Sequence, residues 1–213
     1  MDETAVTVRS VRSVGPDTVA VTFETPPGFP AEPGQFVRVL AEFEGEEQGR
    51  YYTLSSPDVE ETFEVTVGVD PEGTLGPWLA DRDPGDEVRI EGPFGDEYYE
   101  GEDGVVVLAG GPGVGPAVGV GERALAEGAS VTLVYQDDEP VHEDRLAALA
   151  DAGATVVLVT GDLAEAVASV GTHADGVPFV YGFSGFCEAA VEALDAAGFD
   201  VDAAKVESFG PAP

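Results

Sequence analysis

Hydrophobic and polar residues alternate along several short segments in the first hundred residues. Val19, Val21 and Phe23 alternate with small or polar neighbours, and the same period of two recurs over 63–69 and 87–91. Clusters of Pro and Gly, such as "TPPGFPAEPG" and "RDPGD", separate these segments. This pattern predicts short antiparallel strands in a small barrel or sandwich, interrupted by one short helix in "TLGPWLAD".

After "GPFGDEYYEGEDG" the pattern changes to continuous apolar runs that alternate with helix-like stretches. Strands that are apolar throughout are typical of a parallel sheet covered on both faces. We therefore predict a two-domain chain, with an antiparallel β-barrel over 1–100 and an α/β parallel-sheet domain over 101–213. The predicted elements of the second domain are strands at 105–110, 130–136, 154–161, 178–183 and 204–209, and helices at 115–128, 141–153, 162–170 and 185–198.

Acidic residues dominate the charge of the chain. Among 213 residues there are 42 Asp and Glu against 9 Lys and Arg, for a formal net charge of −33. Both halves carry the excess, so self-repulsion destabilises the compact state unless salt screens it. We interpret this as adaptation to a salt-rich cytoplasm. Disorder conflicts with the 43% hydrophobic content, and a docking face for a basic partner would be local. Binding to nucleic acid is disfavoured.

The chain lacks the residues for a metal centre or a disulfide of its own. Cys187 is the only cysteine, and the two histidines, His142 and His173, are far apart in the sequence. No apolar run is long enough to span a membrane, and the N-terminus does not resemble a signal peptide. We expect a cytoplasmic protein without membrane insertion, in which any iron centre belongs to a partner.

The segment "GRYYTLSSP", residues 49–57, gathers groups that can hold a phosphate and a flat ring. In an extended strand Arg50 and Tyr52 share one face, which places a guanidinium fork beside an aromatic ring. Thr53 lies on the other face and would reach the same ligand through its backbone or a twist in the strand. The alternative is an ordinary strand whose arginine lies along the surface.

Two glycine-containing turns are candidate anion sites. In "LAGGPGVGPAVGV" a strand runs through Gly110, Gly111 and Gly113 into a helix, which is how backbone amides and a helix N-terminus approach a diphosphate. The strict G-x-G-x-x-G pattern is absent, and glycines in such a turn can serve packing alone. The start of the short helix in "GTLGPWL" offers a second set of free amides, although the same helix can simply pack into the core.

In this order, the three segments resemble the ferredoxin–NADP reductase superfamily over nearly the whole chain. The family motif R-x-Y-[ST]-x-[ST] matches Arg50, Tyr52, Thr53 and Ser55. The resemblance implies that Arg50 pairs with the flavin phosphate, Tyr52 stacks on the isoalloxazine ring and Thr53 approaches its N5 atom. The closing "VESF" resembles the family's E-x-F, which implies that Glu207 lies near the flavin.

The resemblance also has departures. Gly76 stands where the family's G-x-x-S-x-x-L loop usually has serine, and Tyr181 and Phe183 replace the cysteine and proline of its C-G-P. The implied catalytic residues are Thr53 and Glu207. The implied cofactor-binding residues are Arg50, Tyr52, Thr53, Ser55, Gly73, Thr74, Leu75, Gly76, Gly110, Gly111, Gly113 and Gly182.

By this resemblance the chain is a flavoprotein oxidoreductase that transfers hydride and electrons between NAD(P)H and a separate iron–sulfur or haem carrier protein through FAD. By the resemblance, the pyrophosphate loop at residues 73–76 favours FAD over FMN. Asp137, Asp138 and Glu139 follow the second strand of the α/β domain, where carboxylates favour NAD over NADP. The altered C-G-P region leaves open a non-catalytic, flavin-bearing electron-transfer or redox-sensing subunit. A nucleotide-binding sensor without flavin is a third hypothesis.

Overall fold

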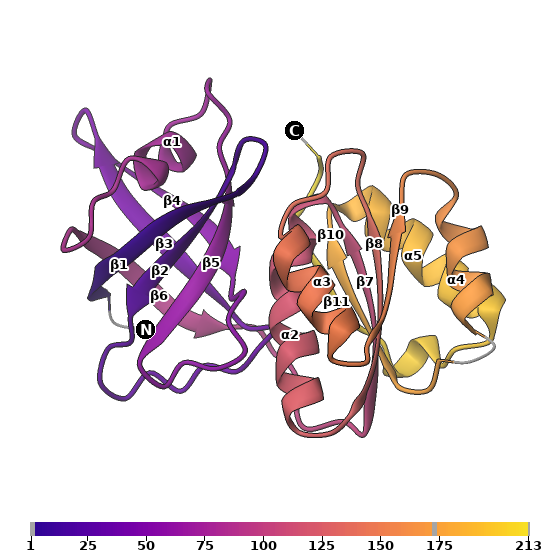
Figure 1. Ribbon diagram of the computed structural model, residues 1–213. Coiled ribbons are helices and arrows are strands. Elements are labelled where there is room, and N and C mark those ends of the chain that lie inside the picture. Colours follow the sequence, from indigo (N-terminus) through magenta and orange to yellow (C-terminus); the bar gives the residue numbers. More distant parts are fainter. Residues whose placement is uncertain (1–2, 172–173, 213) are drawn as a thin grey trace.

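The computed structural model describes residues 3–171 and 174–212. An antiparallel six-stranded sheet comes first and a parallel five-stranded sheet with helices follows (Figure 1). The predicted fold class is therefore confirmed. His173, considered above as a metal ligand, lies outside the described residues.

The first sheet closes into a barrel. Its strand order is β4-β3-β6-β1-β2-β5, and Leu54, just after β4, pairs with Val65 in β5, so the two edge strands meet. Alternate side chains point inward, and the enclosed core includes Phe23, Phe63 and Ile90. The strands are β1 (Thr4–Gly15), β2 (Thr18–Glu24), β3 (Phe36–Phe43), β4 (Glu46–Thr53), β5 (Thr62–Gly68) and β6 (Glu87–Phe94).

One short helix, α1 (Leu75–Ala80), follows β5. It buries Leu75 and Leu79 against the barrel core, and Trp78 packs partly against the same core. The packing role considered in the sequence is therefore real, and it fixes the start of α1 beside the barrel.

The second sheet has the order β11-β10-β7-β8-β9, and all of its strand pairs are parallel. The chain winds outward from β7 to β9 and then returns to β10, so the direction of winding reverses between β7 and β10. Ligands of open α/β sheets bind at the carboxyl ends of the strands at such a reversal. The strands are β7 (Gly104–Gly110), β8 (Ser130–Gln136), β9 (Thr155–Val159), β10 (Val177–Gly182) and β11 (Lys205–Ser208).

Helices cover both faces of this sheet. Helices α2 and α3 lie on the face toward the barrel, and α4 and α5 lie on the far face (Figure 1). Each face has its own buried cluster, one that includes Val118 and Leu146 and one that includes Val167 and Leu194. The helices are α2 (Val114–Ala126), α3 (Glu143–Asp151), α4 (Leu163–Gly171) and α5 (Ser184–Ala197), with short 3-10 turns η1 (Gly111–Gly113) and η2 (Val201–Ala203).

The structure differs from the prediction at several elements. Strand β1 was not predicted, because its polar and apolar positions are mixed over twelve residues. Strand β9 is an edge strand, so it is not buried throughout, and Leu158 is 50% exposed. Helix α3 begins at Glu143 rather than at residue 141, because His142 has a left-handed backbone (φ 57°) that a helix cannot include.

The segment between β6 and β7 is anchored to the second sheet, and the predicted boundary at residues 100 and 101 falls within it. Lys205, in β11, donates from Nζ to the Tyr98 carbonyl oxygen (2.6 Å), to Glu100 (2.9 Å) and to Glu102 (2.6 Å). The single lysine of the chain thus ties this connection to the strand that also carries Glu207.

Candidate functional site

Strand β4 carries the first candidate residues at the line where the barrel closes. Arg50 pairs across the sheet with Val39, and Tyr52 pairs with Val37, so both share the side of β4 that faces the barrel core. The guanidinium of Arg50 is exposed, and Nη1 donates to the neighbouring Gly49 carbonyl oxygen at 3.1 Å. Tyr52 packs partly against the core.

Arg50 is distinctive among the basic residues. The other eight Lys and Arg side chains each form at least one ion pair, whereas Arg50 forms none with the described residues. In a chain with 42 acidic residues, a guanidinium without a carboxylate partner is available to an anionic ligand.

Burial changes the ionisation of Tyr52. It raises the pKa of the phenol to about 12, although the nearby charge of Arg50 partly offsets this. The hydroxyl therefore stays protonated at neutral pH. Tyr51 points the other way and is 63% exposed, with its ring edge-on to Phe36 and Phe94.

Thr53 and Glu207 lie together although they are far apart in the sequence. The Thr53 hydroxyl donates to Glu207 Oε1 at 2.7 Å, across from the end of β4 to β11. Burial raises the pKa of the Glu207 carboxyl to about 7, and the hydrogen bond from Thr53 acts in the opposite direction. The two implied catalytic residues thus form one pair whose carboxyl group titrates near neutral pH.

Ser55 is in a different environment from the other motif residues. It is fully buried, and its hydroxyl donates to Glu64 Oε1 at 3.0 Å. The structure thus places Ser55 in the packing between the barrel and α2, where a side chain on Gly119 would press on the Ser55 backbone. The contact between Ser55 and the flavin that the family motif implies remains a prediction.

The start of α1 lies beside β4. Thr74 donates from Oγ1 to Gln48 Oε1 at 2.8 Å, and Gln48 precedes Arg50 by two residues on the same side of β4. The first amides of a helix have no carbonyl partner within it, so Thr74, Leu75 and Gly76 bring free N–H groups to the same strand as Arg50. The Leu75 side chain is buried, so its backbone alone is available to a ligand.

Both glycines of this segment, Gly73 and Gly76, have a structural role. Gly73 donates from its backbone to the Asp70 carbonyl oxygen at 2.9 Å, which closes the turn before α1. A Cβ atom on Gly76 would lie 2.7 Å from the Gly68 carbonyl oxygen in β5. A side chain at this position would therefore require the backbone of α1 or β5 to shift.

Gly110 and Gly182 meet at the reversal between β7 and β10. A side chain on Gly110 would overlap the ring of Phe186, and a Cβ atom on Gly182 would lie 2.7 Å from the same ring. Phe186 belongs to α5 and is partly buried. The two glycines therefore make room for an aromatic ring over the carboxyl ends of the central strands.

Gly111 and Gly113 have different surroundings. Gly111 has a positive φ of 54° and nothing within 4 Å of where its side chain would be, so it is open to a ligand. A side chain on Gly113 would overlap the Tyr181 carbonyl group, so Gly113 allows the turn η1 to pack on β10. Of these two glycines, Gly111 is the one with open space beside its Cα atom.

Tyr181 and Cys187 are both buried near this reversal. The Tyr181 hydroxyl has no hydrogen-bond partner among the described residues and lies close to Gly34 of the barrel, and burial raises its pKa well above the usual value. Cys187 is close to the Gly182 carbonyl oxygen (3.4 Å), and burial raises the pKa of its thiol. Cys187 thus packs as a small buried residue in the cluster under α5.

The acidic loop after β8 is partly internally bonded. Asp137 accepts from the Tyr135 hydroxyl at 3.0 Å and from the Glu139 backbone at 2.9 Å. Asp138 and Glu139 are exposed at the carboxyl end of β8. The predicted carboxylates therefore lie at the carboxyl edge of the parallel sheet.

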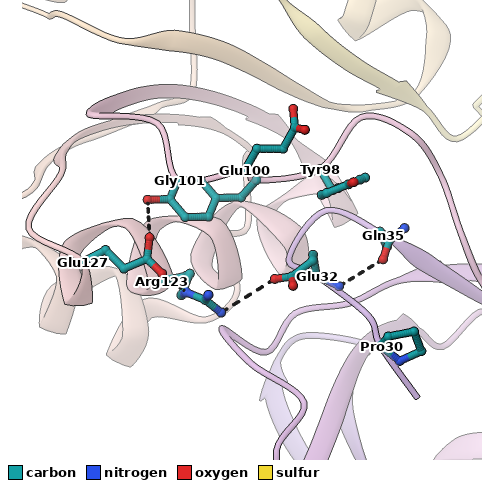
Figure 2. Close-up of a pocket in the computed structure, with 9 residues that line it drawn as sticks. Pro30, Glu32, Gln35, Tyr98, Glu100, Gly101, Arg123 and Glu127 are labelled. Carbon is teal, nitrogen blue, oxygen red and sulfur yellow. Dashed lines mark hydrogen bonds and ion pairs between the residues drawn. The ribbon is translucent and has the colours of Figure 1, made fainter. Parts of the chain in front are cut away.

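A cavity of about 500 Å³ lies elsewhere, at the C-terminal end of α2 (Figure 2). Arg123 lies between Glu127 and Glu32, and Tyr99 donates to Glu127 at 3.1 Å. Carboxylates outnumber the single arginine, so the cavity is unsuited to the phosphates of a nucleotide. Its lining residues are Pro30, Glu32, Gln35, Tyr98, Tyr99, Glu100, Gly101, Arg123 and Glu127.

The described residues contain no group of three or more His, Cys, Asp or Glu side chains arranged to hold a metal ion. His142 instead bonds through Nε2 to the Thr66 hydroxyl at 2.8 Å. Burial and the charges of Arg145 and Arg12 lower its pKa to about 3. Of the helices in the described ranges, none combines the length and apolar character that crossing a bilayer requires.

Known oxidoreductases resemble this chain in both sequence and fold. Residues 5–99 match the family model "Oxidoreductase FAD-binding domain". The cytochrome P450 reductase GcoB of Amycolatopsis superposes on the whole chain with a TM-score of 0.83 and 26% identity, and 71% of that protein is covered. The chain is thus similar to FAD-binding oxidoreductases of the ferredoxin reductase type, in sequence over 5–99 and in fold over its whole length. The predicted resemblance is therefore confirmed.

Two curated relatives are longer than this chain. The glycine betaine monooxygenase reductase subunit of Chromohalobacter salexigens is 29% identical over 211 residues, which cover 85% of this chain and 57% of the relative. The probable dihydroorotate dehydrogenase B electron transfer subunit of Methanopyrus kandleri is 35% identical over 118 residues, 54% of this chain and 40% of the relative. The chain thus spans about half the length of these curated relatives.

Proposed function

We propose that this chain is an FAD-dependent oxidoreductase that passes electrons between a nicotinamide nucleotide and a separate iron–sulfur or haem carrier protein. The observation that carries the proposal is Arg50, which forms no ion pair with the described residues although acidic residues far outnumber basic ones. It stands on the same strand as Tyr52 and Thr53, inside the segment that matches the FAD-binding family.

The residues present fit FAD. The Arg50 guanidinium and the free amides of Thr74 to Gly76 lie along one side of β4 and would hold the two phosphates, which favours FAD over FMN. Tyr52 would provide an aromatic face for the ring. Bound FAD supplies a group that accepts two electrons from a nicotinamide and releases them singly.

The pair Thr53 and Glu207 would control protons beside the ring. The Thr53 hydroxyl is oriented by its hydrogen bond to Glu207 Oε1. Because the carboxyl pKa is about 7, Glu207 can hold or release a proton at that oxygen near neutral pH. The protonation state of Glu207 then decides whether the Thr53 hydroxyl donates its proton to the carboxylate or accepts one from the carboxyl group at the end of β4.

The nucleotide would bind at the reversal between β7 and β10. The open backbone of Gly111 is placed for a diphosphate at the start of η1 and α2. The carboxylates of Asp138 and Glu139 would repel a 2′-phosphate and accept hydrogen bonds from ribose hydroxyls, so we propose NAD rather than NADP. The acid excess supports a salt-rich cytoplasm as the working environment.

A second candidate is a flavin-bearing electron-transfer subunit that does not turn over nicotinamide. Tyr181 and Phe183 favour it, because they replace the cysteine and proline that the family usually has beside the nicotinamide. The relative from Methanopyrus kandleri bears the name of an electron transfer subunit. This candidate predicts bound FAD that neither NADH nor NADPH reduces.

Titration of the apo-protein with FAD in concentrated KCl tests the site. Arg50→Ala should weaken FAD affinity at least tenfold, which corresponds to about 1.4 kcal/mol. Arg9→Ala is the matched control, because Arg9 is an exposed barrel arginine paired with Glu24. Equal affinity of the two variants would contradict the placement of the phosphates at Arg50.

A further inference from the structure

Arg145, in the first turn of α3, reaches from the α/β part of the chain to the barrel. Its Nε and Nη2 atoms each donate to a carboxylate oxygen of Glu122 in α2, both at 2.7 Å. Nη1 donates to Glu64 Oε1 in β5 at 3.0 Å, and Nη2 also donates to the Ser55 carbonyl oxygen at 2.6 Å. The Arg145 side chain is 17% exposed. One guanidinium thus joins α3 to α2, to β5 and to the residue that follows the closing bridge of the barrel.

Ser55 is held firmly at this point. Its backbone N–H donates to the Glu64 carbonyl oxygen at 2.8 Å, and its hydroxyl donates to the Glu64 side chain at 3.0 Å. Ser55 follows Thr53 by two residues, and Thr53 is tied to Glu207. The end of β4 is therefore fixed to the α/β part from two sides, by Glu207 at Thr53 and by Arg145 at Ser55.

The residues around Arg145 hold α3 and α2 against the barrel through uncharged hydrogen bonds and close packing. His142, three residues earlier, donates from its backbone to the Val14 carbonyl oxygen at 2.8 Å and bonds through its ring to Thr66. Gly115 in α2 packs so closely on Thr66 that a Cβ atom would lie 2.8 Å from the Thr66 hydroxyl. The start of α3 and one side of α2 are thus seated on β5, so Arg145 has little freedom to move away.

We propose that Arg145 is a positioning residue for the flavin segment: by holding the Ser55 carbonyl against α2 and β5, it sets the place of Thr53 relative to Glu207. This inference rests on the proposed function, because its consequence is the geometry of a bound flavin. Arg145 itself does not belong to the β4 surface that carries Arg50 and Tyr52.

Lysine at position 145 separates charge from geometry. A lysine keeps the positive charge but lacks the planar fork that reaches two carboxylates and a carbonyl oxygen at once. The variant Arg145→Lys should therefore remain folded in concentrated KCl and yet release the Ser55 carbonyl. Arg82→Lys is the matched control, since Arg82 is a partly buried arginine that pairs with Asp86 and stacks on Trp78 away from Ser55.

The experiment measures FAD affinity and the visible circular dichroism of bound FAD for the parent, R145K and R82K. We expect R145K to bind FAD roughly tenfold more weakly and to change the sign or intensity of the flavin bands, while R82K matches the parent. Should R145K not fold, the double variant R145M/E122Q takes its place with the same expectation, because it removes the cation together with Glu122, one of its two carboxylate partners, and leaves Glu64 paired with Arg12.

Two results separate the inference from the function on which it rests. If the parent binds FAD and R145K shows the parent's affinity and dichroism, Arg145 is not a positioning residue and the proposed function stands. If the parent binds neither FAD nor FMN, the proposed function fails, and this inference fails with it.

Discussion

Replacing Glu207 by glutamine should make the protein more stable above neutral pH and remove one source of its pH dependence. Burial raises the pKa of this carboxyl from an ordinary 4.5 to about 7. A carboxyl with a raised pKa in the folded state binds its proton more tightly when folded than when unfolded. The contribution of Glu207 to the free energy of unfolding is therefore fully present below about pH 4.5. It falls as the pH rises from about 4.5 to about 7, and it is lost above about pH 7.

The size of this effect follows from the same interval. The gap between 4.5 and about 7 corresponds to about 3 kcal/mol of unfolding free energy at 25 °C. For a chain of this length that amounts to roughly 6–12 °C in Tm. Glutamine keeps an oxygen that can accept from Thr53 and carries no charge at any pH, so it isolates the cost of ionisation.

The assay is thermal unfolding in concentrated KCl from pH 4.5 to 8.5. The Tm of Glu207→Gln minus that of the parent should rise across the window and level off above about pH 7. Glu192→Gln, a change at an exposed position on α5, is the control for loss of one negative charge. A difference that stays flat with pH would refute the view that Glu207 titrates from a buried position.

Three further predictions concern packing, nucleotide choice and salt. Gly113→Ala should lower stability by about 1–3 kcal/mol, because the new methyl group overlaps the Tyr181 carbonyl, whereas Gly111→Ala costs about 1 kcal/mol for its positive φ; melting curves of the two variants compare them, and equal Tm values would contradict the packing role. Asp138→Arg should raise the ratio of kcat/KM for NADPH to that for NADH about tenfold or more, and an unchanged ratio in steady-state assays would remove that loop from the nucleotide site. Transfer from concentrated KCl to 0.1 M KCl should lower Tm, because the self-repulsion of a net charge of −33 is then screened over about 10 Å rather than 3 Å; an unchanged Tm would contradict the salt adaptation.

Much of the fold was predictable because the local patterns were strong. Strands β7, β8 and β10 are buried on both faces, and their continuous apolar runs are what such burial requires. Strand β1 was missed because it changes partners along its length, from β6 to β2, and so has no single buried face. The start of α3 depended on the left-handed backbone of His142, which is set by contacts with the barrel.

The site was predictable only in part. Arg50, Tyr52 and Thr53 lie within a contiguous motif, whereas the bond between Thr53 and Glu207 joins residues 154 positions apart. No local signal distinguished Gly111, which is open, from Gly113, which packs on β10, since that depends on which backbone lies above each of them. Arg145 had no signal either, because its importance comes from three partners on separate elements.

The most direct test of the central claim is the visible absorption spectrum of the protein purified in concentrated KCl and supplied with FAD, recorded before and after anaerobic addition of NADH and, separately, NADPH. We predict flavin absorption that is bleached by a nicotinamide nucleotide, with NADH the more effective donor. Flavin absorption that neither nucleotide changes would contradict the reductase and favour the electron-transfer subunit, and a protein that takes up no flavin would contradict both.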